Sequence, residues 1–234
     1  MELQRPEPDD GPQLFQRPHH AGIGLGVRVR IGIDLDNTIV GYDHVFAAQV
    51  VAMGFLKSAS GLTKKQIRDE IRATPHGDEK WQKVQAVVYG PRMEEAVIFP
   101  GVGDFLVRCR ETGTEVFVVS HKTRFAGADK DGTDLRAAAR RWLAGQKFHD
   151  PDGFAIREEN IFFESTRLEK IRRIGDLACT HFIDDLEEVF RHPEFPGRTE
   201  RILFASGATE LPTGPFHAAP SWDEISDAIF ATVS

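Results

Sequence analysis

The sequence has 234 residues, of which 41% are hydrophobic and 28% are charged, and its formal net charge at pH 7 is −7. This composition is ordinary for a globular protein, and the length suits one domain with an insertion or two small domains. The negative charge argues against a general binder of nucleic acids or of anionic membranes. It leaves room for a small anionic substrate, because a site can be locally positive.

Residues 1–26 contain four prolines and several acidic side chains, and they lack the apolar core of a signal peptide. We therefore expect them to form a poorly ordered N-terminal extension. No apolar run approaches the roughly 18 residues needed to span a bilayer. Cys109 and Cys179 are too few and too far apart for a disulfide framework or a zinc cluster, so we expect buried free thiols. These features predict a cytoplasmic protein.

The first strand is predicted at residues 27–33, an apolar run that two arginines and a glycine interrupt. Asp34 and Asp36 follow it directly. Successive side chains of a strand point to opposite faces, so these two carboxylates can share a side. Two neighbouring carboxylates are costly to bury unless a cation lies between them, and Mg²⁺ prefers oxygen ligands. The stretch therefore indicates a magnesium site.

Helical patterns fill residues 42–98. Thr63 is a predicted N-cap with Gln66 at the capping-box position, and Asp78 is predicted to open a second helix. No strand signal here is strong enough to argue for, so we expect a wholly helical insertion. Polar and aromatic side chains of the insertion that could contact a ligand are His44, Lys57, Lys64, Lys65, Arg68, Arg72, Trp81, Gln82, Gln85, Tyr89 and Arg92.

Strand and helix patterns alternate after Pro100. Strands are predicted at 115–119, 160–163, 180–183 and 201–204, and helices at 102–109, 133–143, 168–177, from 186 and at 222–232. Strands separated by helices imply a doubly wound parallel sheet. We therefore predict an α/β fold with a core formed by residues 27–41 and 99–234 and a small α-helical insertion at 42–98. Ligands of such sheets bind at the carboxyl ends of the strands.

Polar side chains stand at the carboxyl ends of three predicted strands. They are Asp34 with Asp36, Ser120 with His121, and Asp184 with Asp185, and Lys170 opens the helix that precedes the last of these strands. This set resembles the four motifs of the haloacid dehalogenase-like (HAD) phosphohydrolases, in the same order. The first motif, Asp-x-Asp-x-Thr, ends here at Thr38. The resemblance covers residues 27–204 and implies a Rossmann-like core, and the insertion corresponds to the C1 cap of that family, here α-helical.

The resemblance also implies a role for each residue. Asp34 is the predicted nucleophile, which forms an aspartyl-phosphate. Asp36 is the predicted general acid, which later activates water. The predicted ligands of Mg²⁺ are Asp34, Asp36 through its main-chain carbonyl, Asp184 directly, and Asp185 as a second ligand or as an acceptor behind it.

Thr38, Ser120, His121 and Lys170 are the residues predicted to bind the phosphate or the substrate. Ser120 would donate its hydroxyl to the phosphoryl group, and Lys170 would balance the charge of the nucleophile and of the phosphate. Lys122, two residues beyond Ser120, competes with Lys170 for this positive role. Asp185 has a second interpretation as a cap of the following helix.

The predicted function is hydrolysis of a small phosphorylated metabolite, either a sugar phosphate or a nucleoside monophosphate, by a Mg²⁺-dependent phosphomonoesterase. A phosphomutase or phosphotransferase shares the aspartyl-phosphate step and stays open. So does a non-catalytic module that binds a phosphorylated ligand on the same fold, although intact Asp34 and Asp36 speak against it. We expect neither a nucleic-acid partner nor a membrane partner, and the sequence leaves the oligomeric state open.

Overall fold

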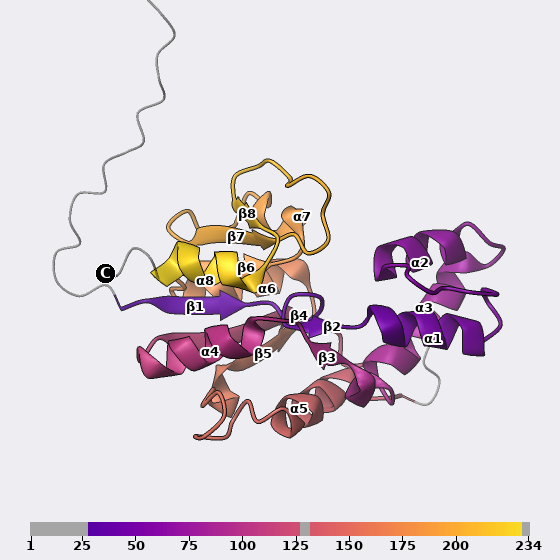
Figure 1. The fold of residues 1–234 in the computed structure, drawn as a ribbon, viewed down its shortest axis with the longest axis horizontal. Helices are drawn as coiled ribbons and strands as arrows, with labels where there is room; N and C mark the ends of the chain where they lie inside the picture. Colours follow the sequence, from indigo (N-terminus) through magenta and orange to yellow (C-terminus); the bar gives the residue numbers. More distant parts are fainter. Residues whose placement is uncertain (1–27, 127–131, 231–234) are drawn as a thin grey trace, which may run out of the picture.

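The computed structural model describes residues 28–126 and 132–230, so the N-terminal extension predicted at residues 1–26 lies outside the described residues. Within these ranges, six strands form one sheet in the order β5-β4-β1-β6-β7-β8 (Figure 1). Every neighbouring pair is parallel. The strands are β1 (Arg30–Ile33), β4 (Glu115–His121), β5 (Ile161–Glu164), β6 (His181–Asp184), β7 (Glu200–Phe204) and β8 (His217–Ala219).

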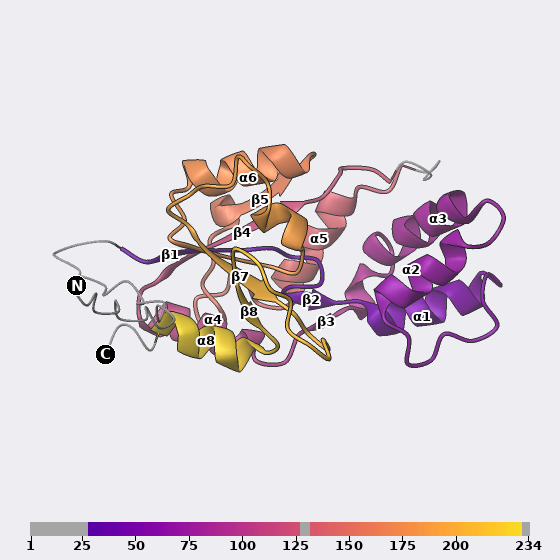
Figure 2. The same cartoon turned by 90° about the horizontal axis from the view of Figure 1, so that it is seen from above.

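Helices cover both faces of the sheet. They are α4 (Val102–Glu111), α5 (Leu135–Gly145), α6 (Arg167–Asp176), α7 (Glu187–Phe190) and α8 (Trp222–Phe230). Val116 and Val118 of β4 pack in one core with α4, α5 and α8, whereas Phe117 and Val119 pack in a second core with α6 and α7. Figure 2 shows α6 on one side of the sheet and α4 and α8 on the other. The predicted doubly wound α/β fold is confirmed.

The strand β8 was not expected. Its sequence, His217-Ala218-Ala219, carries no β-branched or aromatic residue, so no local pattern predicts a strand there. The strand forms because its main chain pairs with β7 at the edge of the sheet, where Phe204 lies opposite Ala219. Tertiary pairing therefore decides the structure of this segment.

A second group of helices lies beyond the carboxyl end of β1 in both views (Figures 1 and 2). It contains α1 (Asp43–Ala52), α2 (Lys64–Arg72), α3 (Gly77–Tyr89) and a short 3₁₀-helix at Met93–Glu95. We call residues 42–96 the helical unit. The predicted capping box of Thr63 and Gln66 is present at the start of α2. No helix in the part of the chain that the structure describes is long and apolar enough to cross a membrane.

The expectation that residues 42–98 are wholly helical is wrong at their end. Val97–Ile98 forms the short strand β3, which pairs antiparallel with β2, Val40–Gly41. These two segments are the connections between the core and the helical unit, so they lie side by side. A pairing of two residues is too short to leave a pattern of alternation, and Val97 is exposed.

Aromatic rings form the centre of the helical unit. Phe46 stacks on Trp81 at 5.0 Å between ring centroids, and Tyr89 meets the edges or faces of Phe46 at 5.6 Å and Tyr42 at 5.0 Å. All four side chains are buried. Trp81 is therefore part of a packed core. Tyr42 and Tyr89 lie on the side of this cluster that faces the sheet, as their contacts described below show.

Candidate active site

The predicted carboxylates lie at the carboxyl end of the sheet. Asp34 directly follows β1, and its N–H donates to the carbonyl of Ile183 at 2.9 Å, which extends the pairing with β6. Asp184 is the last residue of β6, and Ser120 lies near the end of β4. Because β1 lies between β4 and β6, all three side chains belong to adjacent strand ends.

A tight loop after β1 places Asp36. Asn37 adopts a positive φ of 63°, a conformation that asparagine tolerates better than most residues. Its N–H donates to the carbonyl of Val40 at 2.8 Å, which closes the loop. On the other side, the indole of Trp222 donates to the carbonyl of Thr38 at 3.2 Å. The loop is thus held both from within and by α8.

Lys170 joins the first and last motifs. Its Nζ donates to Asp34 Oδ1 at 2.6 Å and to Asp184 Oδ2 at 2.7 Å, and the residue is only 1% exposed. A capping box of Thr166 and Glu169 fixes the start of α6 and so the position of Lys170 in its first turns. Burial alone would lower the pKa of Lys170, but the two carboxylates raise it above its usual value, so the ammonium form is held.

Lys122 binds a different carboxylate. Its Nζ lies 2.7 Å from Asp36 Oδ2, and the hydroxyl of Tyr42 donates to Asp36 Oδ1 at 2.6 Å. Burial would raise the pKa of Asp36, but the charge of Lys122 and the two hydrogen bonds together hold it below its usual value. The two lysines therefore do not compete for one place, and Lys170 rather than Lys122 contacts Asp34.

Asp34, Asp184 and Asp185 form a group that could hold a metal ion. One oxygen of each lies within 4.8 Å of the others. Asp184 Oδ1 also accepts from the N–H of Leu186 at 3.0 Å, which fixes its orientation. Burial, followed by the charges of Asp184 and Asp34, raises the pKa of Asp185 well above its usual value. An all-oxygen set with such mutual repulsion suits a hard divalent cation.

Asp36 and Asp185 differ from the other predicted metal ligands. The side chain of Asp36 is not part of the group of three, because Lys122 and Tyr42 occupy both of its oxygens. The role of its main-chain carbonyl stays a prediction. Asp185 is half-buried and is not the cap of the following helix, because the N-cap of α7 is Leu186 and no side-chain cap bond is formed there.

The remaining predicted phosphate-binding residues differ in their surroundings. Ser120 is buried in β4, beside the end of β1. Thr38 is fully buried, and its hydroxyl has no hydrogen-bond partner among the described residues. His121 is exposed, and its Nε2 lies 3.0 Å from the carbonyl of Ser165. Partial desolvation of the ring nevertheless lowers the pKa of His121. Contact of any of the three with a phosphate stays a prediction.

The helical unit contributes three side chains to this end of the sheet. Tyr42 contacts Asp36 as described, and the ammonium of Lys122 lies 4.5 Å from the ring centroid of Tyr89. The Nζ of Lys64 lies 5.4 Å from the same centroid and 5.7 Å from that of Phe46. Burial lowers the pKa of Lys64, although Asp185 and the other nearby carboxylates oppose this effect. Lys64 is the cation that the unit presents to the acidic cluster.

Tyr42 was not predicted as a site residue, and Lys122 was considered only as a competitor of Lys170, without Asp36 as its partner. A signal was present in the composition. The chain has 17 phenylalanines but only two tyrosines. Both tyrosines, Tyr42 and Tyr89, lie against the Asp36–Lys122 pair. Where phenylalanine fills nearly every aromatic position, the few hydroxyl-bearing rings indicate positions that need a hydrogen bond.

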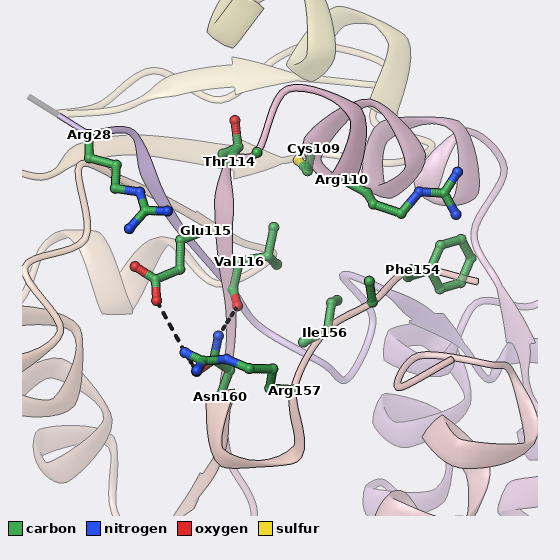
Figure 3. Close-up of a pocket in the computed structure, with 12 residues that line it drawn as sticks. Arg28, Cys109, Arg110, Thr114, Glu115, Val116, Phe154, Ile156, Arg157 and Asn160 are labelled. Atoms are coloured by element: carbon green, nitrogen blue, oxygen red, sulfur yellow. Dashed lines mark hydrogen bonds and ion pairs between the residues drawn. The ribbon is translucent and has the colours of Figure 1, made fainter. Parts of the chain in front are cut away.

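A hollow of about 370 Å³ lies at the opposite edge of the sheet (Figure 3). Several of its polar groups already have partners within the chain. Arg157 lies 3.5 Å from Glu115, Asn160 donates to the carbonyl of Val116 at 3.1 Å, and Arg110 donates to that of Asp152 at 3.1 Å. It holds no pair of carboxylates, so we place the candidate active site at the carboxyl edge instead.

No family model matches the sequence, and no curated protein matches it. Solved structures do resemble it. A HAD family hydrolase from Deinococcus radiodurans R1, with bound phosphate and sodium, is 13% identical with a TM-score of 0.53, and the match covers 88% of this chain and 96% of that one. A HAD-superfamily hydrolase of subfamily IA from Geobacter sulfurreducens is 12% identical with a TM-score of 0.54, covering 86% and 96%.

Protein Tyrosine Kinase A of Mycobacterium tuberculosis is 16% identical with a TM-score of 0.56, and the match covers 86% of this chain and 98% of that one. At such low identities, these matches show the fold alone. The chain has the HAD-like fold, as the order of the four motifs predicted.

Proposed function

We propose that the protein is a Mg²⁺-dependent phosphomonoesterase that works through an aspartyl-phosphate on Asp34. The observation that carries this proposal is the bridge from Lys170 to Asp34 and Asp184, which brings together three residues far apart in the sequence. A buried carboxylate at a strand end, next to a fixed ammonium and two further carboxylates, has the parts that phosphoryl transfer needs: a nucleophile and positive charge for the phosphate oxygens.

In the first step, an oxygen of Asp34 attacks phosphorus and the bond to the leaving oxygen breaks. Asp36 gives a proton to that oxygen, which leaves as an alcohol. The ammonium of Lys170 and the hydroxyl of Ser120 hold oxygens of the transferring group. A bound Mg²⁺, held by Asp34, Asp184 and Asp185 with the carbonyl of Asp36, would neutralise negative charge on the phosphate.

In the second step, a water molecule attacks the phosphorus of the aspartyl-phosphate. Asp36 takes a proton from this water, so that it is again ready to protonate a leaving group. Phosphate leaves and Asp34 is restored. Lys122 and Tyr42 stabilise the carboxylate form of Asp36, which is the form that accepts the proton of water in this step.

We further propose that the helical unit is an α-helical cap that closes over the substrate. Supporting this proposal, Asp34 is only 5% exposed and side chains of the unit, Tyr42 among them, reach the carboxyl edge of the sheet. A cap excludes water and contacts the part of the substrate that is not phosphate. Sugar phosphates and nucleoside monophosphates are the substrate classes to test first.

A phosphotransferase or phosphomutase is the second candidate. It would pass the phosphoryl group of Asp34 to a hydroxyl instead of water, and the near-complete burial of Asp34 favours exclusion of water. One protein of similar fold is named a protein tyrosine kinase. We place either enzyme in the cytoplasm, where the free, buried Cys109 and Cys179 stay reduced.

The test is phosphate release from a panel of sugar phosphates and nucleoside monophosphates by wild-type protein and by Asp34→Asn, each with Mg²⁺ and with EDTA. We expect release by the wild type with Mg²⁺ alone. Release that survives both EDTA and Asp34→Asn would contradict the mechanism. Consumption of a phosphate ester without release of phosphate, in the presence of an added alcohol or sugar, would favour the phosphotransferase.

A further inference from the structure

Lys122 is a buried cation that the proposed mechanism does not require for binding phosphate. Its side chain is 3% exposed, and its ammonium lies 2.7 Å from Asp36 Oδ2. The same ammonium lies 4.5 Å from the ring centroid of Tyr89. A lysine in this setting is held by a carboxylate on one side and an aromatic face on the other. Among the described residues, its ammonium forms no ion pair with Asp34 or Asp184, which pair instead with Lys170.

Hydrogen bonds of the main chain fix the position of the Lys122 backbone, from which this side chain extends. The N–H of Lys122 donates to the carbonyl of Glu164 at 2.9 Å, and its carbonyl accepts from Arg136 Nε at 2.8 Å. Arg136 also donates to Ser165 Oγ at 2.8 Å. The loop after β4 is thus locked to the loop after β5. The position of the ammonium is set by this frame and does not depend on the flexible stem alone.

Asp36 in turn has both carboxylate oxygens engaged, Oδ1 by the hydroxyl of Tyr42 and Oδ2 by Lys122. A carboxylate bound at one oxygen alone can still rotate about its terminal torsion, which is broad. Binding at both oxygens, from two different segments, removes that freedom. The carboxylate of Asp36 is therefore held in one orientation. Its contacts with Tyr42 and Lys122 are separate from the ion pair of Asp34 and Lys170.

We propose that Lys122 is a positioning residue for phosphoester cleavage, which acts by orienting the carboxyl group of Asp36 toward the leaving oxygen. This proposal rests on the proposed function. Lys122 itself touches neither the phosphate nor the leaving group. The proton that reaches the leaving oxygen comes from Asp36, and the later proton from water returns to Asp36, so Lys122 gains and loses none.

Aryl and alkyl phosphates separate this role from a merely structural one. The nitrophenolate of p-nitrophenyl phosphate leaves without protonation, whereas the alkoxide of an alkyl phosphate such as glycerol phosphate needs a proton from Asp36. The value of kcat/KM reports the steps up to departure of the leaving group. We expect Lys122→Met to lower kcat/KM for the alkyl phosphate by roughly 100-fold or more, and for p-nitrophenyl phosphate by less than about 10-fold.

A double-mutant cycle gives an independent readout. In the Asp36→Asn background, where no proton donor is left to orient, Lys122→Met should change kcat/KM for the alkyl phosphate by less than about 3-fold. Lys122→Arg, which keeps a cation beside Asp36, should restore part of the loss. Lys83→Met serves as the matched control, because Lys83 lies exposed on α3 and is not among the predicted ligand contacts, and it should leave both substrates unaffected.

An equal loss on aryl and alkyl phosphates, or full additivity with Asp36→Asn, would overturn the proposal and make Lys122 a structural residue. A rise in KM common to both substrates would overturn it in favour of direct contact with the phosphate. If Lys122→Met does not fold, Lys122→Arg is used in its place, both for the comparison of aryl with alkyl phosphate and for the double-mutant cycle with Asp36→Asn. Wild-type protein that releases phosphate from neither substrate, nor from the panel above, would refute the proposed function itself.

Discussion

Two buried lysines divide the candidate site into two halves. Lys170 pairs with Asp34 and Asp184, and all three residues belong to the α/β core. Lys122 pairs with Asp36, and this pair is completed by Tyr42 and Tyr89 of the helical unit. The ion pairs of the first half are therefore formed within the sheet and α6, whereas those of the second are completed by contacts from the helical unit.

The two halves have different proposed roles in the reaction. In the proposed mechanism, the half around Lys170 contains the nucleophile and the metal ligands, which any phosphate ester would need. The half around Lys122 contains Asp36, the proposed proton donor and acceptor, and Tyr42 of the helical unit contacts it directly. Under this proposal, a substrate that fits the helical unit influences proton transfer without altering the nucleophile. Substitutions in the two halves should therefore have effects of different kind and size.

The largest effect is expected for Lys170→Met. It leaves the buried carboxylates of Asp34 and Asp184 without their shared cation, which should lower the free energy of unfolding by about 3–5 kcal/mol. Urea denaturation in EDTA measures this loss. Mg²⁺ should restore part of it, because a bound cation supplies positive charge to the same oxygens. A loss below about 1 kcal/mol would show that the pair is not buried in solution.

The second prediction concerns pH. Burial, with Asp184 and Asp36 adding and Lys170 opposing, raises the pKa of Asp34 from 3.8 to about 6. The folded state therefore holds a proton that the unfolded chain has released. The contribution of Asp34 to stability is complete below pH 3.8 and is lost as pH rises to about 6.

Wild-type protein in EDTA should thus lose stability relative to Asp34→Asn, which does not titrate, as pH rises through this window. Chemical denaturation of both proteins at several pH values measures the difference. Saturating Mg²⁺ should abolish the trend, because a cation beside the carboxylate lowers its pKa. A relative stability that increases with pH in EDTA would contradict the assignment.

A smaller effect is expected for Tyr42→Phe in the other half. The change removes the 2.6 Å hydrogen bond to Asp36 and keeps the ring among Phe46 and Tyr89. Loss of a hydrogen bond to a charged acceptor should lower the free energy of unfolding by about 2 kcal/mol. Tyr89→Phe is the matched control, and its effect should be smaller, since the hydroxyl of Tyr89 bonds to Gln85. Equal losses would place the stabilisation in the aromatic cluster.

The smallest effect on stability is expected for Lys64→Met, within about 0.5 kcal/mol, because no ion pair is broken among the described residues. Its effect on catalysis should be a rise in KM of roughly 10-fold with little change in kcat, as for a residue that binds substrate and transition state alike. Steady-state kinetics on the best substrate of the panel, with Lys83→Met as control, would decide this. A fall in kcat alone would assign Lys64 to the chemical step.

Order along the chain was enough to predict the first half of the site. Parallel strands separated by helices bring their carboxyl ends to one edge, so Asp34, Ser120 and Asp184 could be placed together without knowing any side-chain contact. Lys170 followed from its place in the motif order. Its bond to both carboxylates depends on a capping box at Thr166, which a local pattern also specifies.

The second half could not be predicted in this way. The choice of partner for Lys122 depends on the direction that its side chain takes after β4, which the lock on its main chain decides. The contact of Tyr42 depends on the placement of the helical unit. The short strands β3 and β8 depend on pairing alone. Such features arise from tertiary contacts, for which a single sequence holds no periodic signal.

The central place of β1 has a consequence for how the protein opens. This strand is hydrogen-bonded on both sides, by β4 and by β6, and Asp34 continues the second pairing. Amide hydrogens in such a strand exchange with solvent only when the whole core unfolds, whereas peripheral helices open in smaller fluctuations. Slow exchange at Gly32 and Asp34, with faster exchange in α1 and α2, would mean that warming disrupts the contacts of the helical unit with the site while Asp34, the proposed nucleophile, is still in place.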